Sequence, residues 1–213
     1  MNSIKMLAAA GALLSVLAPS AANAQSKAVT LRLGAFMPTN GDAKDAVGKT
    51  WLSFGGDFVI KGTTAGGLVS AATLNSVEPL VYADYASKSK DVNGGKNEAS
   101  TLGVGVGARY FPPTQSITSI RPYIAGGVGV YFLHGKSTTT TDTTPPPPPG
   151  QGAVVPAALV TTTDSKNKTN FGFKINGGVE FAQNYVVDVA YWNAGKIQDV
   201  KIDGYTVSLG LRF

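Results

Sequence analysis

The stretch Ile202-Asp-Gly-Tyr-Thr-Val-Ser-Leu-Gly-Leu-Arg-Phe213 decides the fold of this chain. From Tyr205 onward every second residue is apolar, and the residues between are small or polar. Because the side chains of a β-strand point alternately to the two faces of a sheet, this stretch has one apolar and one polar face. It predicts a strand whose apolar face carries Tyr205, Val207, Leu209, Leu211 and Phe213.

The same alternation recurs in seven earlier segments. They cover 29–37, 51–60, 77–85, 102–110, 121–132, 171–181 and 185–192. An even number of alternating segments, each of about ten residues, is the sequence signature of the smallest transmembrane barrels. The chain is therefore predicted to be all-β, an eight-stranded antiparallel up-and-down transmembrane β-barrel.

The amino-terminus predicts export from the cytoplasm. Lys5 follows a short polar start, an apolar run extends to Leu17, and Ala22-Asn-Ala24 is an A-x-A cleavage site. This order is typical of a secretory signal peptide, so we expect 1–24 to be removed and 25–213 to form the barrel. There is no cysteine, and the 18 basic and 13 acidic residues are scattered. Scattered bases give no nucleic-acid-binding footprint.

Two stretches resemble a known class of protein. Pro122-Tyr-Ile-Ala-Gly-Gly-Val-Gly-Val130 is similar to a strand common in small OmpA-, OmpW- and opacity-type barrels, and the aromatic terminal strand resembles their closing strand. The chain thus resembles the OmpA/OmpX/OmpW/opacity superfamily of bacterial outer-membrane proteins. The resemblance implies that Tyr205 to Phe213 form the assembly signal read by the barrel-assembly machinery. Expected partners are outer-membrane lipids, that machinery and periplasmic chaperones, and the expected state is a monomer.

Nine charges of the eight segments fall on the polar face. A basic residue facing lipid costs about 2–4 kcal/mol near the membrane midplane, so this face is predicted to point into the lumen. The inward charges are four bases and five acids: Arg32, Asp57, Glu78, Asp84, Arg109, Lys174, Glu180, Asp188 and Arg212. We interpret them as a packed ion-pair network, with a narrow polar channel as the alternative. Strands 29–37 and 202–213 must be neighbours, so Asp57 and Asp188 are expected to reach between Arg32 and Arg212.

The connections predict which end of the barrel faces outward. With a periplasmic amino-terminus, 38–50, 86–98, 133–170 and 193–202 face outside. The longest contains a threonine-rich run and five prolines at 145–149, and we expect a low-complexity extracellular loop at about 135–169. The connection 61–76 is long for a periplasmic turn.

A soluble secreted β-sandwich is an alternative with the same polar and apolar split. The outward aromatic residues favour the barrel, because they gather at the two ends of the strands, as in the girdles at membrane interfaces. One predicted girdle is Phe58, Tyr110, Phe181, Tyr185 and Phe213, and the other is Tyr85, Phe132, Phe171, Tyr191 and Tyr205.

The sequence offers little that points to an enzyme or a cofactor. The single histidine, His134, lies near Ser137 and Asp142 in the expected loop, where nothing would hold a catalytic geometry. We expect no enzyme activity, no cofactor and no metal. The favoured function is a non-enzymatic surface protein, structural or adhesive through its outer loops. The alternative is an OmpW-like channel for small hydrophobic molecules, in which Trp51 and Trp192 would line a pocket at the outer rim or else plug it.

Overall fold

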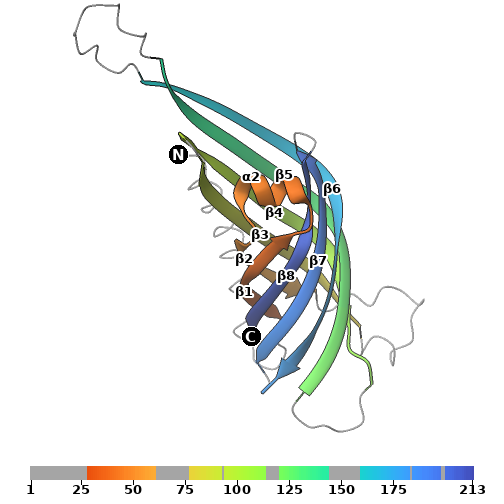
Figure 1. Ribbon diagram of the computed structural model, residues 1–213. Helices are drawn as coiled ribbons and strands as arrows, with labels where there is room; N and C mark the ends of the chain where they lie inside the picture. The colour runs from red at the N-terminus through yellow and green to blue at the C-terminus, as the bar shows by residue number, and fades with distance from the viewer. Residues whose placement is uncertain are drawn as a thin grey trace, which may run out of the picture.

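The computed structural model describes residues 28–60, 77–92, 94–113, 120–143, 159–182, 184–197 and 200–213. Over these residues the chain forms a closed barrel in which each strand pairs with its sequence neighbours and the last strand pairs with the first. All eight pairings are antiparallel (Figure 1). The prediction of an eight-stranded up-and-down barrel is confirmed, and the soluble-sandwich alternative is wrong.

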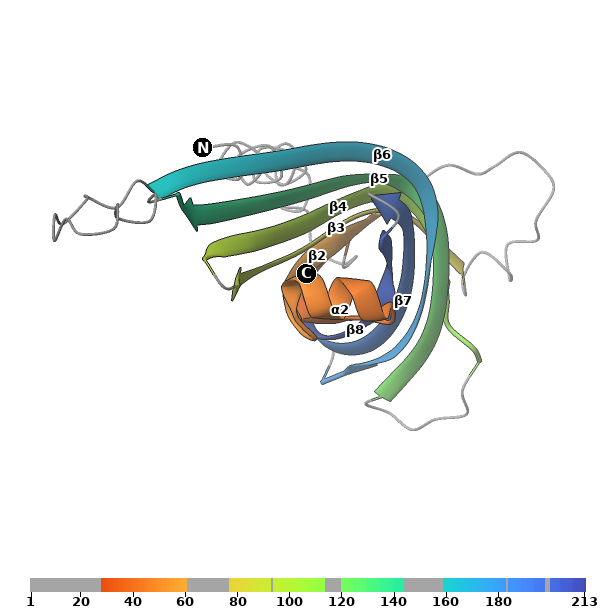
Figure 2. The same ribbon diagram turned by 45° about the horizontal axis from the view of Figure 1, so that its top comes forward.

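The strands differ greatly in length. Their bounds are β1 Val29–Pro38, β2 Trp51–Val59, β3 Val77–Val92, β4 Gly95–Tyr110, β5 Ile120–Asp142, β6 Leu159–Phe181, β7 Tyr185–Ile197 and β8 Val200–Arg212. A short helix, α2 Gly41–Val47, connects β1 to β2. From above, this helix lies over the mouth of the barrel (Figure 2). Within the described part of the chain, no helix has the length and apolar character needed to cross a membrane.

The predicted assignment of side chains to the lumen and to the outside of the barrel is confirmed in all eight strands. Inward side chains such as Tyr82, Arg109 and Asp188 are buried, whereas Leu33, Val128 and Leu209 on the opposite face are exposed. Exposed apolar side chains around a closed barrel would be unfavourable in water, and they match the hydrocarbon of a bilayer. The two predicted aromatic groups also assemble, with the Phe181 and Tyr185 rings 5.6 Å apart near one end and the Tyr191 and Tyr205 rings 5.3 Å apart near the other.

The outer connections differ from the prediction. The expected loop at 135–169 is largely strand: β5 and β6 pair continuously from Ile120 opposite Phe181 to Asp142 opposite Leu159. Likewise, the connection 86–98 is mostly paired strand, because Val92 lies opposite Gly95. β-Branched threonines favour strands, so the runs that flank the prolines extend the sheet instead of forming a loop.

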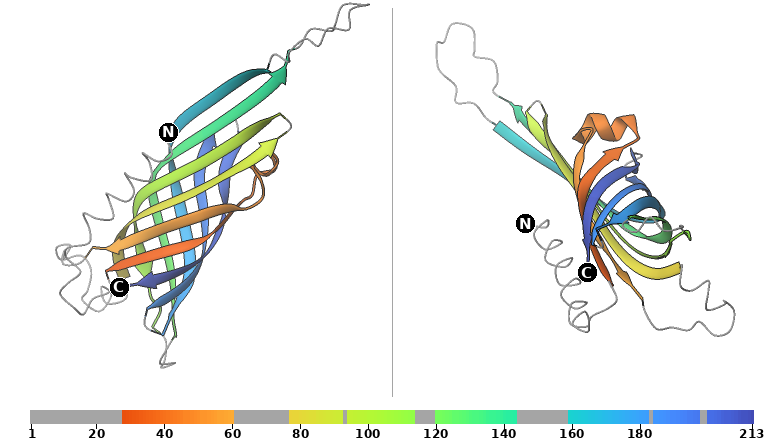
Figure 3. Two further views of the ribbon diagram at one scale, coloured as in Figure 1. Left: turned by 90° about the vertical axis from the view of Figure 1, so that its left-hand side faces the viewer. Right: turned by 90° about the horizontal axis from the view of Figure 1, so that it is seen from below.

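Four strands, β3 to β6, therefore continue beyond the outer rim of the barrel. We call the part of them formed by 88–92, 95–100, 134–142 and 159–170 the outer extension. It stands away from the barrel and leans to one side (Figures 1 and 3). The predicted signal peptide 1–24 and the connection 61–76 lie outside the described residues.

Candidate functional site

The centre of the lumen holds a network of buried ion pairs. Asp57 is its hub: Arg32 Nη1 lies 2.6 Å from Asp57 Oδ2, and Arg109 Nη2 donates to both carboxylate oxygens at 2.9 and 2.8 Å. On the other side of Arg32, its Nη2 lies 3.6 Å from Asp84 Oδ1, and Lys174 Nζ donates to Asp84 Oδ2 at 2.7 Å. These five side chains come from five different strands, so the network links those strands across the lumen.

Asp188 joins the same network through neutral donors as well as charge. Its carboxylate accepts hydrogen bonds from Ser208 Oγ at 2.5 Å, Tyr123 OH at 3.0 Å and Asn176 Nδ2 at 3.2 Å. Arg32 Nη1 lies 3.4 Å from Asp188 Oδ2. Every oxygen of this buried carboxylate is therefore satisfied, which removes most of the cost of burying it.

A second cluster closes the periplasmic end. Arg212 donates to both oxygens of Glu78, at 2.7 and 2.6 Å, and to Glu180 at 2.9 Å. The prediction that Asp188 reaches Arg212 is wrong. Asp188 lies opposite Ser208 on β8, while Arg212 lies opposite Thr30 on β1, so the stagger of the strands separates them along the barrel axis. Asp57 does reach Arg32, as expected, but not Arg212.

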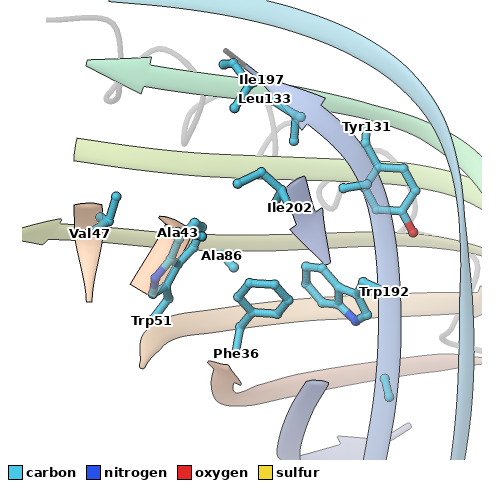
Figure 4. Packing of buried hydrophobic residues seen from close by; sticks show 12 residues of the cluster. Phe36, Ala43, Val47, Trp51, Ala86, Tyr131, Leu133, Trp192, Ile197 and Ile202 are labelled. Atoms are coloured by element: carbon cyan, nitrogen blue, oxygen red, sulfur yellow. The ribbon is translucent and has the colours of Figure 1, made fainter. Parts of the chain in front are cut away.

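The outer end of the lumen is plugged by apolar side chains. Phe36 is fully buried, with its ring centroid 5.3 Å from Trp51 on one side and 5.3 Å from Trp192 on the other (Figure 4). Ala43 and Val47 of α2 pack onto this cluster from above. The Trp51 indole N–H donates to the carbonyl of Gly48 at 3.0 Å, which fixes the end of the helix over the rim. The two tryptophans plug the mouth, and Trp192 borders only a small cavity of about 10 Å³.

Inward glycines give room to tyrosine rings and do not leave a passage. An added Cβ at Gly103 would lie 2.5 Å from Tyr131 Cε1, and one at Gly127 would lie 2.7 Å from Tyr82 Cε1. The two small cavities among these side chains hold about 10 Å³ each, about one water molecule at most. Among the described residues the lumen is thus filled from the Arg212 cluster to the tryptophan plug.

The terminal strand lies where a lipid-facing signal would have to lie. Tyr205, Val207, Leu209, Leu211 and Phe213 are all exposed on the outside of the barrel. Backbone hydrogen bonds join Phe213 to Val29 in both directions, at 3.2 and 2.8 Å, so this strand also closes the barrel against β1.

The outer extension is the structural feature that the sequence interpretation missed. On its outward face Lys96 Nζ lies 2.7 Å from Glu98 Oε1, and this hydrogen bond lowers the pKa of the Glu98 carboxyl below its ordinary value. His134 Nδ1 lies 2.7 Å from Asn167 Oδ1, and Ser137 Oγ donates to Asn97 at 2.9 Å. Among the described residues, no hydroxyl is hydrogen-bonded to His134 and no three potential metal ligands lie together. The signal available in the sequence was the strand propensity of the two threonine runs.

Comparison with solved structures finds other small outer-membrane barrels. Neisserial surface protein A is 16% identical with a TM-score of 0.50, over 86% of this chain and 94% of that one. Ail, the attachment invasion locus protein of Yersinia pestis, is 15% identical with a TM-score of 0.48, over 87% and 97%. The outer membrane enzyme PagL is 16% identical with a TM-score of 0.42, over 87% and 99%. At these identities the likeness concerns the fold.

No curated protein sequence matches the chain significantly. Residues 6–213, however, match the family described as "Outer membrane protein beta-barrel domain". The match includes all eight strands of the closed barrel. The chain is therefore a bacterial outer-membrane protein that belongs to the outer membrane protein beta-barrel domain family.

Proposed function

We propose that this protein is a non-enzymatic surface protein, a closed barrel that anchors the outer extension and presents it to other surfaces. One observation carries the proposal: side chains fill the described lumen, while four strands continue beyond the rim. A barrel built for transport needs space along its axis, and a barrel built for anchoring does not.

The chemistry of the lumen supports an anchoring role. Opening a path past Asp57 would separate it from Arg32 and Arg109, which are both buried. Leaving a buried charge without its partner costs about 3–5 kcal/mol. That cost is comparable to much of the stability of a whole domain, about 5–15 kcal/mol, so spontaneous opening would be rare.

The chemistry of the outer extension supports an adhesive role toward acidic surfaces. Its described residues include more lysines than acids: Lys88, Lys90, Lys96, Lys136, Lys166 and Lys168 against Asp91, Glu98, Asp142 and Asp164. Lysine-rich surfaces attract polyanions, and this attraction weakens as salt screens it. Acidic polysaccharides at a cell surface are therefore the partner class that we propose.

The proposal is tested with the protein in phospholipid vesicles and planar bilayers. A variant lacking 137–164 removes paired ends of β5 and β6, because Ser137 lies opposite Asp164. We expect the full chain to bind immobilised heparin in a salt-dependent manner, the shortened variant to bind several-fold less, and both to keep the bilayer insulating. A stable open conductance in the full chain, or equal heparin binding by the two proteins, would refute the proposal.

The terminal strand is proposed as the contact with the assembly machinery. Its support is the row of exposed apolar side chains that ends in Phe213. The barrel is expected to remain a monomer within its own membrane, surrounded by lipid.

A further inference from the structure

Strand β6 has a free edge outside the membrane. It pairs with β5 along its whole length, but its pairing with β7 begins only at Phe173, opposite Asn193. No described residue pairs with the other side of 159–169. At the base of this edge, Asn170 Nδ2 donates to the carbonyls of Ala194 and Lys196, at 3.2 and 3.1 Å. In Figure 1 the outer part of β6 stands at the margin of the extension, with β5 along one side only.

Such an edge can pair with another strand. In an antiparallel sheet, every second residue of an edge strand directs its N–H and C=O away from the sheet, and these groups accept an added strand. The edge 159–169 contains no proline and no glycine, and five of its eleven residues are valine or threonine, which favour strands. It has neither a bulge nor a proline, two of the devices with which proteins block an edge, and its charges, Asp164, Lys166 and Lys168, restrict which strand can pair with it.

The residues along this edge are complementary to themselves. If two copies pair antiparallel about Ser165, Asp164 of each lies opposite Lys166 of the other. The same register places Thr163 opposite Asn167, Thr162 opposite Lys168 and Thr161 opposite Thr169. Opposite charges across two strands are stabilising.

Neighbouring registers are unfavourable. Pairing about Lys166 would place the two Lys166 side chains directly opposite each other, and pairing about Asp164 would do the same for two carboxylates. Like charges that face each other across strands are destabilising, so the charges select the register centred on Ser165.

The direction of β6 decides where the second copy must be. In every copy this strand runs from its outer tip at Leu159 toward the membrane that holds the barrel (Figure 3). An antiparallel partner therefore runs away from that membrane, and its own barrel must be inverted. Two copies in one membrane direct their edges the same way and cannot form this pairing.

We propose that the outer extension joins two copies of this chain in opposed outer membranes, by antiparallel pairing of their 161–169 edges about Ser165. The contact would hold neighbouring cells or vesicles together and is compatible with a monomer in each membrane. It rests on the proposed adhesive function but names a different partner, a second copy in place of an acidic polysaccharide.

The charge pair supplies a decisive test. Vesicles that carry donor or acceptor lipids, with the full-length protein in both, should cluster and give energy transfer. D164K alone and K166D alone should each lower the clustering rate about tenfold, because each sets two like-charge pairs opposite each other. Mixing D164K vesicles with K166D vesicles should restore clustering, since two basic residues then face two acidic ones. D91K makes the same charge change as D164K on the β3 margin of the extension, and it should cluster like the parent.

A cross-linking experiment tests the register independently. The chain has no cysteine. S165C places two thiols directly opposite each other, within the Cα separation of about 4.4–6.8 Å that a disulfide needs, while T163C places them four residues apart along the pair. Mild oxidation of mixed vesicles should link S165C copies between vesicles and leave T163C largely unlinked.

Absence of clustering by the parent protein, failure of the mixed variants to recover, or equal linking at both positions would overturn the inference. Heparin binding by the same vesicles separates the two proposals. If heparin binding persists when self-clustering fails, the adhesive function stands and the pairing of two copies is wrong.

Discussion

Replacing Asp57 by alanine should destabilise the barrel more than removing any other acidic side chain of the lumen. The carboxylate accepts three short hydrogen bonds, one from Arg32 and two from Arg109. Arg32 keeps Asp84 and Asp188 nearby, but Arg109 is left with Glu78 alone, whose Oε2 lies 3.7 Å from its Nη1. Arg109 is only 1% exposed, so water cannot replace the lost partner.

We expect D57A to lower the free energy of unfolding by about 3–5 kcal/mol, the usual effect of breaking a buried ion pair by removing one partner. Removing Arg109 as well eliminates the buried positive charge that D57A leaves without its main partner. The double variant D57A/R109A should therefore be less destabilised than the sum of the two single variants, with a coupling of about 2 kcal/mol. R121A is the control: the Arg121 side chain is 56% exposed and 3.7 Å from Glu180, so its loss should cost under about 1 kcal/mol.

The measurement is reversible urea unfolding in phospholipid vesicles, followed by the fluorescence of the two buried tryptophans. Electrophoresis of unheated samples provides an independent readout, because a folded barrel migrates differently from the unfolded chain. Additivity within about 0.5 kcal/mol would mean that water screens both charges. That result would refute the sealed lumen and favour a hydrated channel.

Three other substitutions test the remaining contacts. G103V should cost about 1–3 kcal/mol in the same unfolding assay, because the fully buried Tyr131 ring cannot move away, whereas G126A on the lipid face should be nearly neutral. F36A should cost about 3–5 kcal/mol and loosen the outer plug, which a red shift of tryptophan emission would report; an unchanged spectrum would contradict the packing described. Deleting Phe213 should reduce the yield of folded barrel in the outer membrane, judged from the band of unheated samples, and normal yield would contradict its role in assembly.

Much of this structure can be predicted from the sequence because successive side chains of a strand alternate between its two faces. Once Tyr205, Val207 and Leu209 are assigned to lipid, Thr206 and Ser208 must face the lumen. The same step places inside the nine charges assigned to the lumen in the sequence analysis. The burial of Arg32 and Lys174 follows from this phase alone, without knowledge of the partners.

Predicting which residues form ion pairs requires the register of the strands, and the alternation of side chains does not determine that register. A barrel staggers its strands, so residues at similar positions in two segments lie at different heights. Arg212 therefore contacts Glu78 and Glu180, although Asp188 lies on the neighbouring strand. The outer extension was missed for a different reason. A run such as Thr138 to Thr141 has no apolar face, and a strand that stands in water on both faces leaves no alternation to detect.

The tip of the β5–β6 hairpin has a consequence for protein engineering. Asp142 and Leu159 are paired partners, so the two ends of the intervening segment lie beside each other. Because the entropy of closing a loop grows only with the logarithm of its length, a long foreign sequence placed there adds little strain to the barrel. The tip is thus a natural site for displaying an epitope or an enzyme on a bacterial surface, held at a distance from the bilayer by a stiff ribbon of sheet.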